Sequence, residues 1–486
     1  MTLPGAVWDF AVCGRGCIGS SGAPKNGITT SGLRFAATLY ANGSASARRF
    51  SAFADQLERK QTAAEAKLNL GTTSYYRSDY LLHRRPGWSA SWKGRSNRTM
   101  PSRCVNHDDK MGADSGEGAT LVYRSDTAGT EMAGIWPVIN WQEYPGVTVQ
   151  QGNLAPCAWH YIYDHEPTFV GSVSDGTNGA AAQLLHHHNI SAKRSWSFGD
   201  GGVTTLVTDL RATCSAAQAS CSQNATVTTV VNAILEPGAA FLRVGSGKVE
   251  QINASAVNAI NNTVVLYGGA AAVAWHNYSC YVMRSPSQAE LSLEVQAGKL
   301  FGNLLRITAL PKPASASIFR LSLLHTAGAK MLVDATYTVL PNVAKGACFA
   351  LDPKVPAGVA VSTVATSAAN GTGLSAHVLQ NTTSATASVI IFPDANQSDV
   401  EVKLDFGSHK LKLKVGTAGA GCLLQLRLNE GAPDSGQWLA VAASNPELSG
   451  ATVHIYPAKD DTRSGCKLVL PSGEHAGKSV TCILDL

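Results

Sequence analysis

Arg15 is the residue of this sequence whose type and setting most directly suggest chemistry. It follows Gly14 in the segment Trp8–Gly16, which reads WDFAVCGRG. A guanidinium group stays charged, and its planar fork of donors matches the geometry of a carboxylate. Arg15 is therefore a candidate for binding an acidic group of a substrate. The alternative interpretation is a surface arginine that follows a turn glycine.

The residue types that bind metals do not form a metal motif in this sequence. None of the 11 cysteines belongs to a paired C-x-x-C array with zinc spacing. His186, His187 and His188 are adjacent, but successive side chains of a strand point to opposite faces. An exposed polar segment beside the glycosylation acceptor Asn189 is the favoured interpretation of these histidines. We expect no metal and no cofactor.

The elements that must position such residues are predominantly strands. The chain has 486 residues, of which 44% are hydrophobic, 15% are charged and 46 are glycine, so it is long enough for several domains. Short apolar segments alternate with Gly, Pro, Asn and Asp, a spacing typical of antiparallel sheets packed as a sandwich. These segments include residues 119–123, 225–233, 263–267, 318–324, 388–392, 400–406, 409–415 and 422–428.

Only the region near the amino terminus has helical periodicity. Apolar residues recur at helical spacing over residues 31–69, which predicts helix there. The composition becomes rich in Ala, Gly, Ser and Thr after residue 345, which predicts a domain boundary. The expected organisation is a helical region at 1–72, a large β-sandwich at 73–345, a linker-like boundary at 346–380 and a small β-domain at 381–486.

Charge and glycosylation motifs bear on partners and location. The net charge of +5 is spread along the chain, which is compatible with a polyanionic partner and gives little support to a nucleic-acid partner. No apolar segment is long enough to span a bilayer, and we expect a monomer. Asn-x-Ser/Thr acceptors favour a secreted glycoprotein. They occur at Asn42, Asn97, Asn189, Asn224, Asn253, Asn261, Asn277, Asn370, Asn381 and Asn396.

Two further observations fit a secreted protein. Cys214 with Cys221, and Cys466 with Cys482, could close local loops in an oxidising compartment, and the odd number of cysteines leaves at least one thiol unpaired. No secretory signal precedes Trp8. We therefore expect the natural amino terminus to lie upstream of Met1.

A series of motifs, in the same order along the chain, resembles polysaccharide lyase family 8, which contains hyaluronate, chondroitin and xanthan lyases. The segment Trp8–Gly16 resembles the arginine loop of that family. It is followed by DYLLHRRPGW at 79–88, SNR at 96–98, GEGATLVY at 116–123, YPGVTV at 144–149, FVGSVS at 169–174, KRSWSF at 193–198 and ATYTVLP at 335–341. The resemblance implies the end of an α/α toroid, then a large antiparallel β-sandwich and a small β-domain. It also implies that most of the helical catalytic domain is absent from this sequence.

The resemblance implies site residues as well. These lyases cleave uronate-containing chains by β-elimination, and an arginine and an asparagine bind the uronate carboxylate while a tyrosine, assisted by a histidine, transfers protons. Arg15 matches the first arginine of the loop, but Gly19 stands where the second is expected. Asn106 is a candidate sugar-contacting residue, and Arg103 replaces a glutamate of the family pattern. His83, in the HRRP strand, is expected to be structural.

The sequence thus supports three functional hypotheses. The first is a secreted lyase that acts on an acidic polysaccharide, in which Arg15 binds the uronate carboxylate and Asn106 contacts the sugar. The second is a non-catalytic carbohydrate-binding or structural β-sandwich protein derived from such a lyase, and Gly19 and Arg103 favour it. The third is a nucleic-acid-binding or protein-binding module, which rests on the mild positive charge alone.

Overall fold

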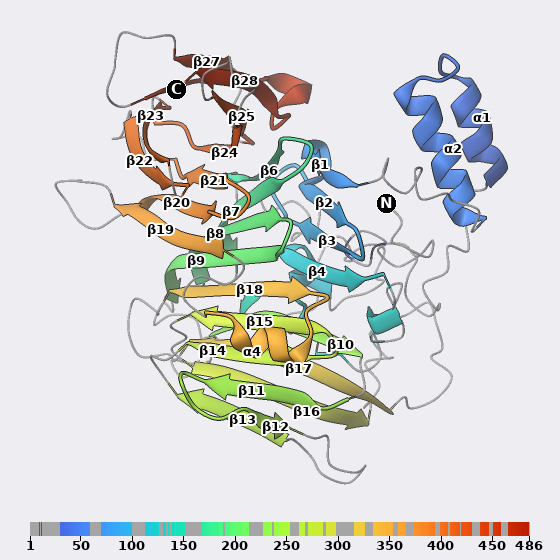
Figure 1. Cartoon of the computed structure of the whole chain (residues 1–486), viewed down its shortest axis with the longest axis vertical. Coiled ribbons are helices and arrows are strands. Elements are labelled where there is room, and N and C mark those ends of the chain that lie inside the picture. Colours follow the sequence, from blue (N-terminus) through green and yellow to red (C-terminus); the bar gives the residue numbers. More distant parts are fainter. Residues whose placement is uncertain are drawn as a thin grey trace, which may run out of the picture.

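The computed structural model of the chain consists mainly of antiparallel strands (Figure 1), which confirms the predicted fold class. Within the described residues, these strands form five sheets. The structure describes residues 9, 11, 30–58, 70–99, 112–125, 130–132, 135, 139–140, 142–151, 168–187, 190–212, 227–235, 238–252, 262–267, 271–284, 288–297, 315–325, 334–352, 358–365, 374–393, 399–406, 409–417, 419–429, 438–446, 451–457 and 465–485.

Three sheets build the central sandwich. The first sheet has the order β1 (Gly71–Tyr75), β2 (Tyr80–Arg85), β3 (Trp88–Lys93), β4 (Ala119–Arg124). The nine-stranded sheet has the order β12 (Glu250–Ile252), β11 (Ala240–Val244), β14 (Ala272–His276), β15 (Ser279–Arg284), β18 (Ala335–Pro341), β9 (Gly202–Ala212), β8 (Ile190–Gly199), β7 (Gly179–His187), β6 (Val170–Ser174). The five-stranded sheet has the order β13 (Asn262–Tyr267), β16 (Gln288–Ala297), β17 (Ser315–His325), β10 (Val227–Leu235), β5 (Thr148–Gln150).

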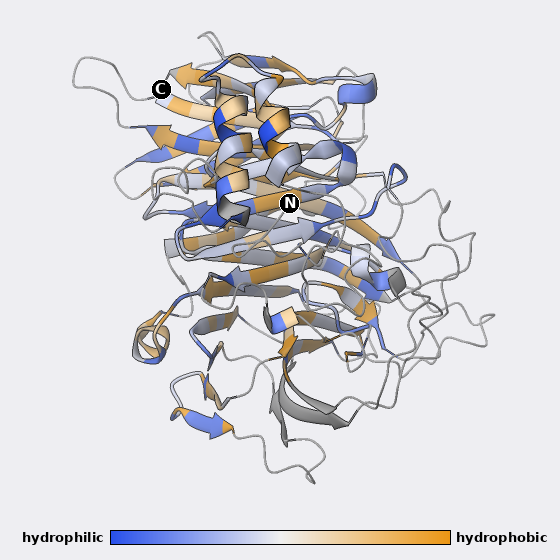
Figure 2. Ribbon diagram, turned by 90° about the vertical axis from the view of Figure 1, so that its right-hand side faces the viewer, coloured by the Kyte–Doolittle hydropathy of each residue, from blue (hydrophilic) through white to orange (hydrophobic). Residues whose placement is uncertain are grey.

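Alternating side chains hold these sheets together. Along β3, Trp88, Ala90 and Trp92 point to one face and pack with Trp196 and Phe198 of the nine-stranded sheet. A larger core lies among all three sheets and includes residues of β2, β4, β10, β17 and β18. Hydrophobic residues recur along the strands (Figure 2), and their side chains form the cores between the sheets, because alternate residues of a strand share one face.

The outer face of the nine-stranded sheet has two covers. Near β11, β14, β15 and β18 it is covered by α4 (Lys345–Ala350), whose Cys348 forms a disulfide with Cys280 of β15. Near β6 to β9 it packs against a six-stranded sheet of the order β19 (Val359–Ala365), β20 (Leu374–Asn381), β21 (Thr386–Ile391), β24 (Cys422–Asn429), β25 (Trp438–Ser444), β28 (Val480–Asp485).

The last part of the chain forms a second, smaller sandwich. The six-stranded sheet packs on its other side against β22 (Asp399–Asp405), β23 (Lys410–Gly416), β26 (Thr452–Pro457) and β27 (Cys466–Val469). Strand β22 alternates strictly between exposed and buried residues, as the sequence pattern predicts. The suggested pair Cys466–Cys482 is a disulfide in the structure, and Cys422 is a buried free thiol.

The helical prediction for residues 31–69 was too long. The described part contains α1 (Thr30–Thr38) and α2 (Ala45–Leu57), which form a helical hairpin, and residues 59–69 lie outside the described residues. Residues 39–44 separate the two helices; within them Gly43 has a φ of 74°, and the Ser44 hydroxyl accepts a hydrogen bond from the amide of Ala47 at 3.2 Å. The glycine allows the chain to turn, and the serine caps the start of α2.

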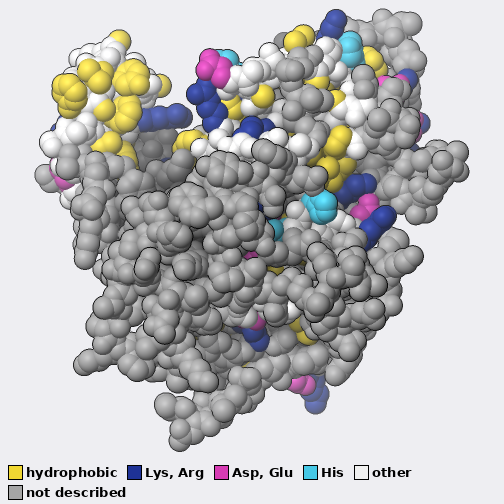
Figure 3. Space-filling model, turned by 180° about the vertical axis from the view of Figure 1, so that it is seen from behind, with side chains coloured by type: hydrophobic (Ala, Val, Ile, Leu, Met, Phe, Trp, Pro, Cys, Tyr) yellow, Lys and Arg dark blue, Asp and Glu magenta, His cyan; other side chains and the backbone are white. Residues whose placement is uncertain are grey.

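The helical hairpin keeps an exposed apolar face. Phe35 and Leu39 are 66% and 68% exposed, and the hairpin shows a cluster of hydrophobic side chains in Figure 3. Arg34 on α1 binds Asp55 and Glu58 across the hairpin. None of the helices in the described part of the chain is long and apolar enough to cross a bilayer.

The expected domain limits stay predictions. The segment 346–380, expected as a linker-like boundary, contains most of α4, all of β19 and most of β20. Since β19 and β20 belong to the six-stranded sheet, the strands of the second sandwich begin at Val359. The Ala/Gly/Ser/Thr-rich composition concealed them, because small residues give little apolar contrast between the faces of a strand.

A buried histidine joins the two sandwiches and makes their packing sensitive to pH. His377 of β20 forms hydrogen bonds of 2.7 Å with the hydroxyls of Ser195 on β8 and Thr208 on β9. Burial, with a smaller effect of Lys193, lowers the pKa of His377 to about 3. The unfolded chain binds this proton more readily than the folded chain below about pH 6.5.

We therefore predict that stability falls as the pH drops from about 6.5 towards 3, with His377 contributing at most about 1.4 kcal/mol per pH unit. His377→Leu should reduce this slope, measured by urea unfolding at several pH values. His475→Leu is the control, because its side chain is exposed. Equal slopes for His377→Leu and the parent chain would contradict the prediction.

Candidate functional site

Asp9, shortly before Arg15 in the sequence, is buried against the first sheet. Its carboxylate accepts hydrogen bonds from the hydroxyl of Tyr80, from the hydroxyl of Tyr123 at 3.1 Å and from the amide of Ala11 at 2.8 Å. The side chains of Asp9, Tyr80 and Tyr123 are fully buried. Burial and the neighbouring Asp9 carboxylate raise the pKa of Tyr80 well above its usual value, so this phenol stays protonated and donates to Asp9.

The register of the first sheet explains why two tyrosines meet one carboxylate. Tyr80 of β2 is opposite Lys93 of β3, and Lys93 is opposite Ala119 of β4. Tyr123 lies four residues after Ala119 on β4, and residues separated by an even number share a face of the sheet. Tyr80 and Tyr123 therefore project from the same face, and Asp9 receives both hydroxyls.

A second buried carboxylate, that of Glu117, precedes β4. It accepts hydrogen bonds from Arg95 and from the side-chain amide of Gln183 at 2.9 Å. His187 lies 3.6 Å from Glu117 and donates to Asp114 at 2.6 Å. Burial disfavours the ionised form of Glu117, but Arg95 and His187 together lower its pKa below the ordinary value.

Arg194 supports the same segment from β8. Its guanidinium donates to the carbonyl of Glu117 at 2.7 Å and to the carbonyl of Gly146. Gly118 makes this approach possible, because it has a φ of 77° and a Cβ there would lie 2.6 Å from an Arg194 nitrogen and 2.7 Å from the Trp196 ring. Burial lowers the pKa of Arg194 to about 10, so it remains charged at neutral pH.

A third buried carboxylate, Asp79, binds the residues that follow β3. It accepts hydrogen bonds from Ser96 at 2.5 Å, from Thr99 at 2.6 Å and from Arg98 at 2.6 Å. Arg98 also donates to the carbonyl of Val170 on β6 at 2.9 Å. This contact ties the loop after β3 to the nine-stranded sheet.

The Asp79 and Glu117 clusters bracket the segment that contains Asn106. Ser96 to Thr99 are held by Asp79 before the segment, and Asp114 and Glu117 are held by His187 and Arg95 after it. Asp114 belongs to the 3-10 helix η3 (Gly112–Gly116). Buried ionic contacts thus hold the described residues on both sides of the chain segment 100–111.

Lys93 lies between these two clusters. Burial lowers its pKa to about 8, and the carboxylates of Asp79 and Glu117 oppose this shift. Its ammonium donates to the carbonyl of Gly94. Lys93 is therefore close to its titration midpoint at mildly alkaline pH, in the same cross-strand row as Tyr80.

The two predicted site residues, Arg15 and Asn106, lie outside the described residues, as do Gly19 and Arg103. Their assignments stay predictions. His83 is buried and bonds the Thr72 hydroxyl at 2.6 Å and the Gly199 carbonyl at 3.1 Å, in agreement with a structural role. Of the adjacent histidines, His186 is exposed and His187 is buried, so the predicted alternation is correct but His187 is not part of an exposed segment.

Sequence reasoning missed the buried ionic clusters. The available signal was a charged residue within or beside an apolar strand. Charged residues make up only 15% of the chain, yet this is where Lys93, Arg95, Glu117 and Arg194 lie. In the described part of the chain, no three His, Cys, Asp or Glu side chains gather as metal ligands would.

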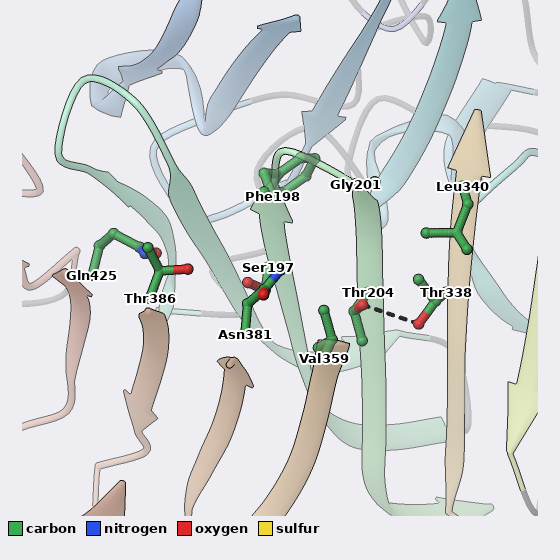
Figure 4. A pocket seen from close by; sticks show the side chains of 12 residues that line it. Ser197, Phe198, Gly201, Thr204, Thr338, Leu340, Val359, Asn381, Thr386 and Gln425 are labelled. Atoms are coloured by element: carbon green, nitrogen blue, oxygen red, sulfur yellow. Dashed lines mark hydrogen bonds between the residues drawn. The ribbon is translucent and has the colours of Figure 1, made fainter. Parts of the chain in front are cut away.

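A small pocket between the sandwiches is not a sugar site. It is lined by residues of β8, β9 and β18 and by Val359, Asn381, Thr386 and Gln425 of the second sandwich (Figure 4). Thr204 and Thr338 bond one another at 3.0 Å on its wall. Its volume of 20 Å³ has room for about one water molecule, which is far too little for a pyranose ring.

The three sheets of the central sandwich correspond to a known family domain. The family model for the super-sandwich domain of polysaccharide lyase family 8 matches residues 70–350. This match covers more than half of the chain and includes every strand from β1 to β18. The chain belongs to polysaccharide lyase family 8.

Two family 8 enzymes resemble parts of the chain in sequence. Chondroitinase-AC of Pedobacter heparinus is 30% identical over 166 residues, which are 32% of this chain and 22% of that enzyme. Hyaluronate lyase of Thermasporomyces composti is 28% identical over 131 residues, which are 26% of this chain and 17% of that enzyme.

Solved structures show the same fold over nearly the whole chain. A chondroitinase AC lyase solved with oligosaccharides has a TM-score of 0.72 at 19% identity, covering 99% of this chain and 63% of that chain. Paenibacillus xanthan lyase has a TM-score of 0.68 at 15% identity, covering 94% of this chain and 44% of that chain. The chain therefore spans less than two thirds of each of these relatives.

The contacts of Asp9 predict a large cost for its removal. Asp9→Ala leaves the buried hydroxyls of Tyr80 and Tyr123 without their acceptor, so we expect a loss of about 2–4 kcal/mol in the free energy of unfolding. In a Tyr80→Phe/Tyr123→Phe background the same substitution should cost much less, measured as a double-mutant cycle by urea unfolding. Asp200→Ala is the control, because that carboxylate is 63% exposed. Additive effects would contradict the prediction.

The Asp114–His187 pair predicts a second pH effect. Burial opposes protonation of His187, but Glu117 and Asp114 together raise its pKa above 6.5. Protonated His187 therefore adds to the free energy of unfolding below about pH 6.5. This contribution is lost as the pH rises through the pKa of His187 in the folded protein. Asp114→Asn should lower the pKa of His187 in an NMR titration and reduce this loss. An unchanged pKa would show that Asp114 does not hold the proton on His187.

Proposed function

We propose that this protein is a polysaccharide lyase that cleaves a uronate-containing acidic polysaccharide by β-elimination. In this reaction a base removes the C5 proton beside the uronate carboxylate, the C4–O bond to the leaving sugar breaks, and a C4–C5 double bond forms. The leaving oxygen takes up a proton. A cation on the carboxylate stabilises the enolate-like transition state, which is usually the largest catalytic effect.

The contact between Asp9 and the first sheet carries this proposal. Asp9 belongs to the WDFAVCGRG segment that contains Arg15 and is held by Tyr80 and Tyr123 of the family 8 super-sandwich domain. In this proposal the Asp9 contact anchors the segment from which Arg15 acts, and preorganised cationic groups are the effective ones in catalysis. The relatives include a chondroitinase, a hyaluronate lyase and a xanthan lyase, which supports an acidic polysaccharide as substrate.

In this proposal Arg15 binds the uronate carboxylate and Asn106 contacts the sugar. The buried polar residues have a different role. Tyr80 and Tyr123 donate to Asp9, and His187 is engaged by Asp114 inside the protein, so they position the segments and do not transfer protons to substrate. We assign no proton-transferring base among the described residues.

The proposal includes an extracellular location and a monomeric state. The disulfides Cys280–Cys348 and Cys466–Cys482 support an oxidising compartment. An enzyme that depolymerises a large extracellular polysaccharide must also meet it outside the cell. Glycosylation at acceptor asparagines belongs to the same proposal.

The direct test is the release of unsaturated uronide, followed by its ultraviolet absorbance, from hyaluronan, chondroitin sulfate and xanthan. We expect Arg15→Ala to lower kcat/KM by about 100- to 1,000-fold, as loss of a charge-stabilising contact does. Asn106→Ala should weaken activity less, chiefly through KM. Arg15→Lys should recover only part of the activity, because lysine lacks the planar fork.

Arg49→Ala is the matched control, because Arg49 is an exposed arginine on α2. Release of uronide that is insensitive to Arg15→Ala would reject the assigned role of Arg15. Binding of acidic polysaccharide without any release of uronide would instead support the non-catalytic alternative, which Gly19 and Arg103 favour.

A further inference from the structure

Three aromatic side chains form a row on the outside of the nine-stranded sheet. Phe241 of β11 is opposite Trp275 of β14, and their ring centroids are 5.8 Å apart. Tyr278 follows in the β14–β15 turn, with its centroid 5.9 Å from that of Trp275 in an edge-on arrangement. We call Phe241, Trp275 and Tyr278 the aromatic row. It borders α4, which covers the neighbouring part of the same face.

Tyr278 occupies a backbone position that does not suit it. Asn277 and Tyr278 form the two-residue turn between β14 and β15, and their φ angles are 42° and 60°. Such turns favour glycine at the second position, because a side chain there costs about 1 kcal/mol or more. Burial does not repay this cost, since Tyr278 is 54% exposed. A strained residue that gains little from packing points to a function.

The rest of the aromatic row is held rigidly. Trp275 is half-buried, and its indole nitrogen donates to the carbonyl of Val343 at 2.8 Å. The Val343 amide donates to the carbonyl of Tyr278 at 2.9 Å, and the Cys280–Cys348 disulfide fixes the adjacent α4. A surface that is already ordered loses little entropy when a ligand binds.

Positive charges flank the aromatic row at both ends. The exposed Lys345 lies with its ammonium 4.0 Å from the centroid of Phe241. At the other end, the Arg124 guanidinium carbon is 6.0 Å from the centroid of Tyr278, but Arg124 is only 5% exposed. Lys345 is therefore the stronger attraction for an anion.

We propose that the aromatic row is a binding site for a segment of acidic polysaccharide. The C–H groups of a pyranose ring carry partial positive charge and stack on the negative face of an aromatic ring, while a carboxylate or sulfate group meets Lys345. Arg124 directly follows Tyr123 on β4, and successive side chains of a strand point to opposite faces. The aromatic row and the Asp9 contact thus lie on opposite sides of β4, so the proposed binding site is separate from the Asp9 contact.

This inference shares the substrate class of the proposed function but does not depend on cleavage. The test measures binding of size-defined oligosaccharides of hyaluronan and chondroitin sulfate by calorimetry, with neutral dextran as the uncharged probe. Arg15→Ala is used as the background, so that cleavage does not consume the probe.

Tyr278→Gly is the decisive variant, because it removes the ring and relieves the strained turn. We expect its Kd to rise about fivefold or more, the effect of losing one anchoring aromatic residue, while Tm stays equal or rises. Lys345→Gln should weaken binding and reduce its dependence on salt. Ala385→Gly is the control for the turn, because Ala385 has a φ of 49°, and Lys412→Gln, which removes an exposed lysine of β23, is the control for charge.

Unchanged affinity in both Tyr278→Gly and Lys345→Gln would overturn the inference, and so would equal binding of neutral dextran. A loss of affinity that also appears in Ala385→Gly and Lys412→Gln would overturn it as well. The outcome is separable from the proposed lyase function. If uronide is released but affinity is unchanged in both Tyr278→Gly and Lys345→Gln, only the aromatic row is rejected. If Tyr278→Gly loses binding and no uronide is released by the parent chain, only the lyase function is rejected.

Discussion

The carboxylate of Glu117 is buried in a protein that has few charges, and the strands of the central sandwich are arranged so that this carboxylate has partners. An ionised carboxylate loses several kcal/mol of hydration when it is buried, and it recovers this only through close and well-directed partners. Arg95 comes from the loop after β3, and Gln183 and His187 come from β7. The first sheet and the nine-stranded sheet must therefore keep one relative position, because a shift of either would leave the charge without its partners.

The same constraint reaches the segments that the proposed function uses. The backbone carbonyl of Glu117 accepts a hydrogen bond from Arg194 of β8, and His187 also bonds Asp114 within η3. Asp79 plays the corresponding part on the other side, since it gathers Ser96, Arg98 and Thr99. Apolar packing of Trp92 against Trp196 supplies the hydrophobic stabilisation, but it is not directional. The hydrogen bonds of the buried carboxylates are directional, and they fix where the connecting segments leave the sheets.

The sequence was informative where a residue's environment follows from its neighbours along the chain. Strand β22 alternates between exposed and buried positions, and its bounds nearly match the expected 400–406. Prediction failed where the partner is distant in sequence. The apolar periodicity predicts one long helix because the two helices of the hairpin have the same period, whereas residues 39–44 separate them. The residues next to Glu117 in the sequence do not indicate that Gln183 and His187 are its partners. The sequence around Cys348 likewise does not indicate that Cys348 pairs with Cys280. The family motifs located the sandwich because they record such distant contacts indirectly.

The buried charges also separate the residues that position from those that react. Asp9, Asp79 and Glu117 are fully buried, so none of them can touch a polysaccharide. In the proposed lyase, contact with substrate then falls to residues on the connecting segments, such as Arg15 and Asn106. This division follows a general rule, in which loops carry the chemistry and a rigid scaffold aims them.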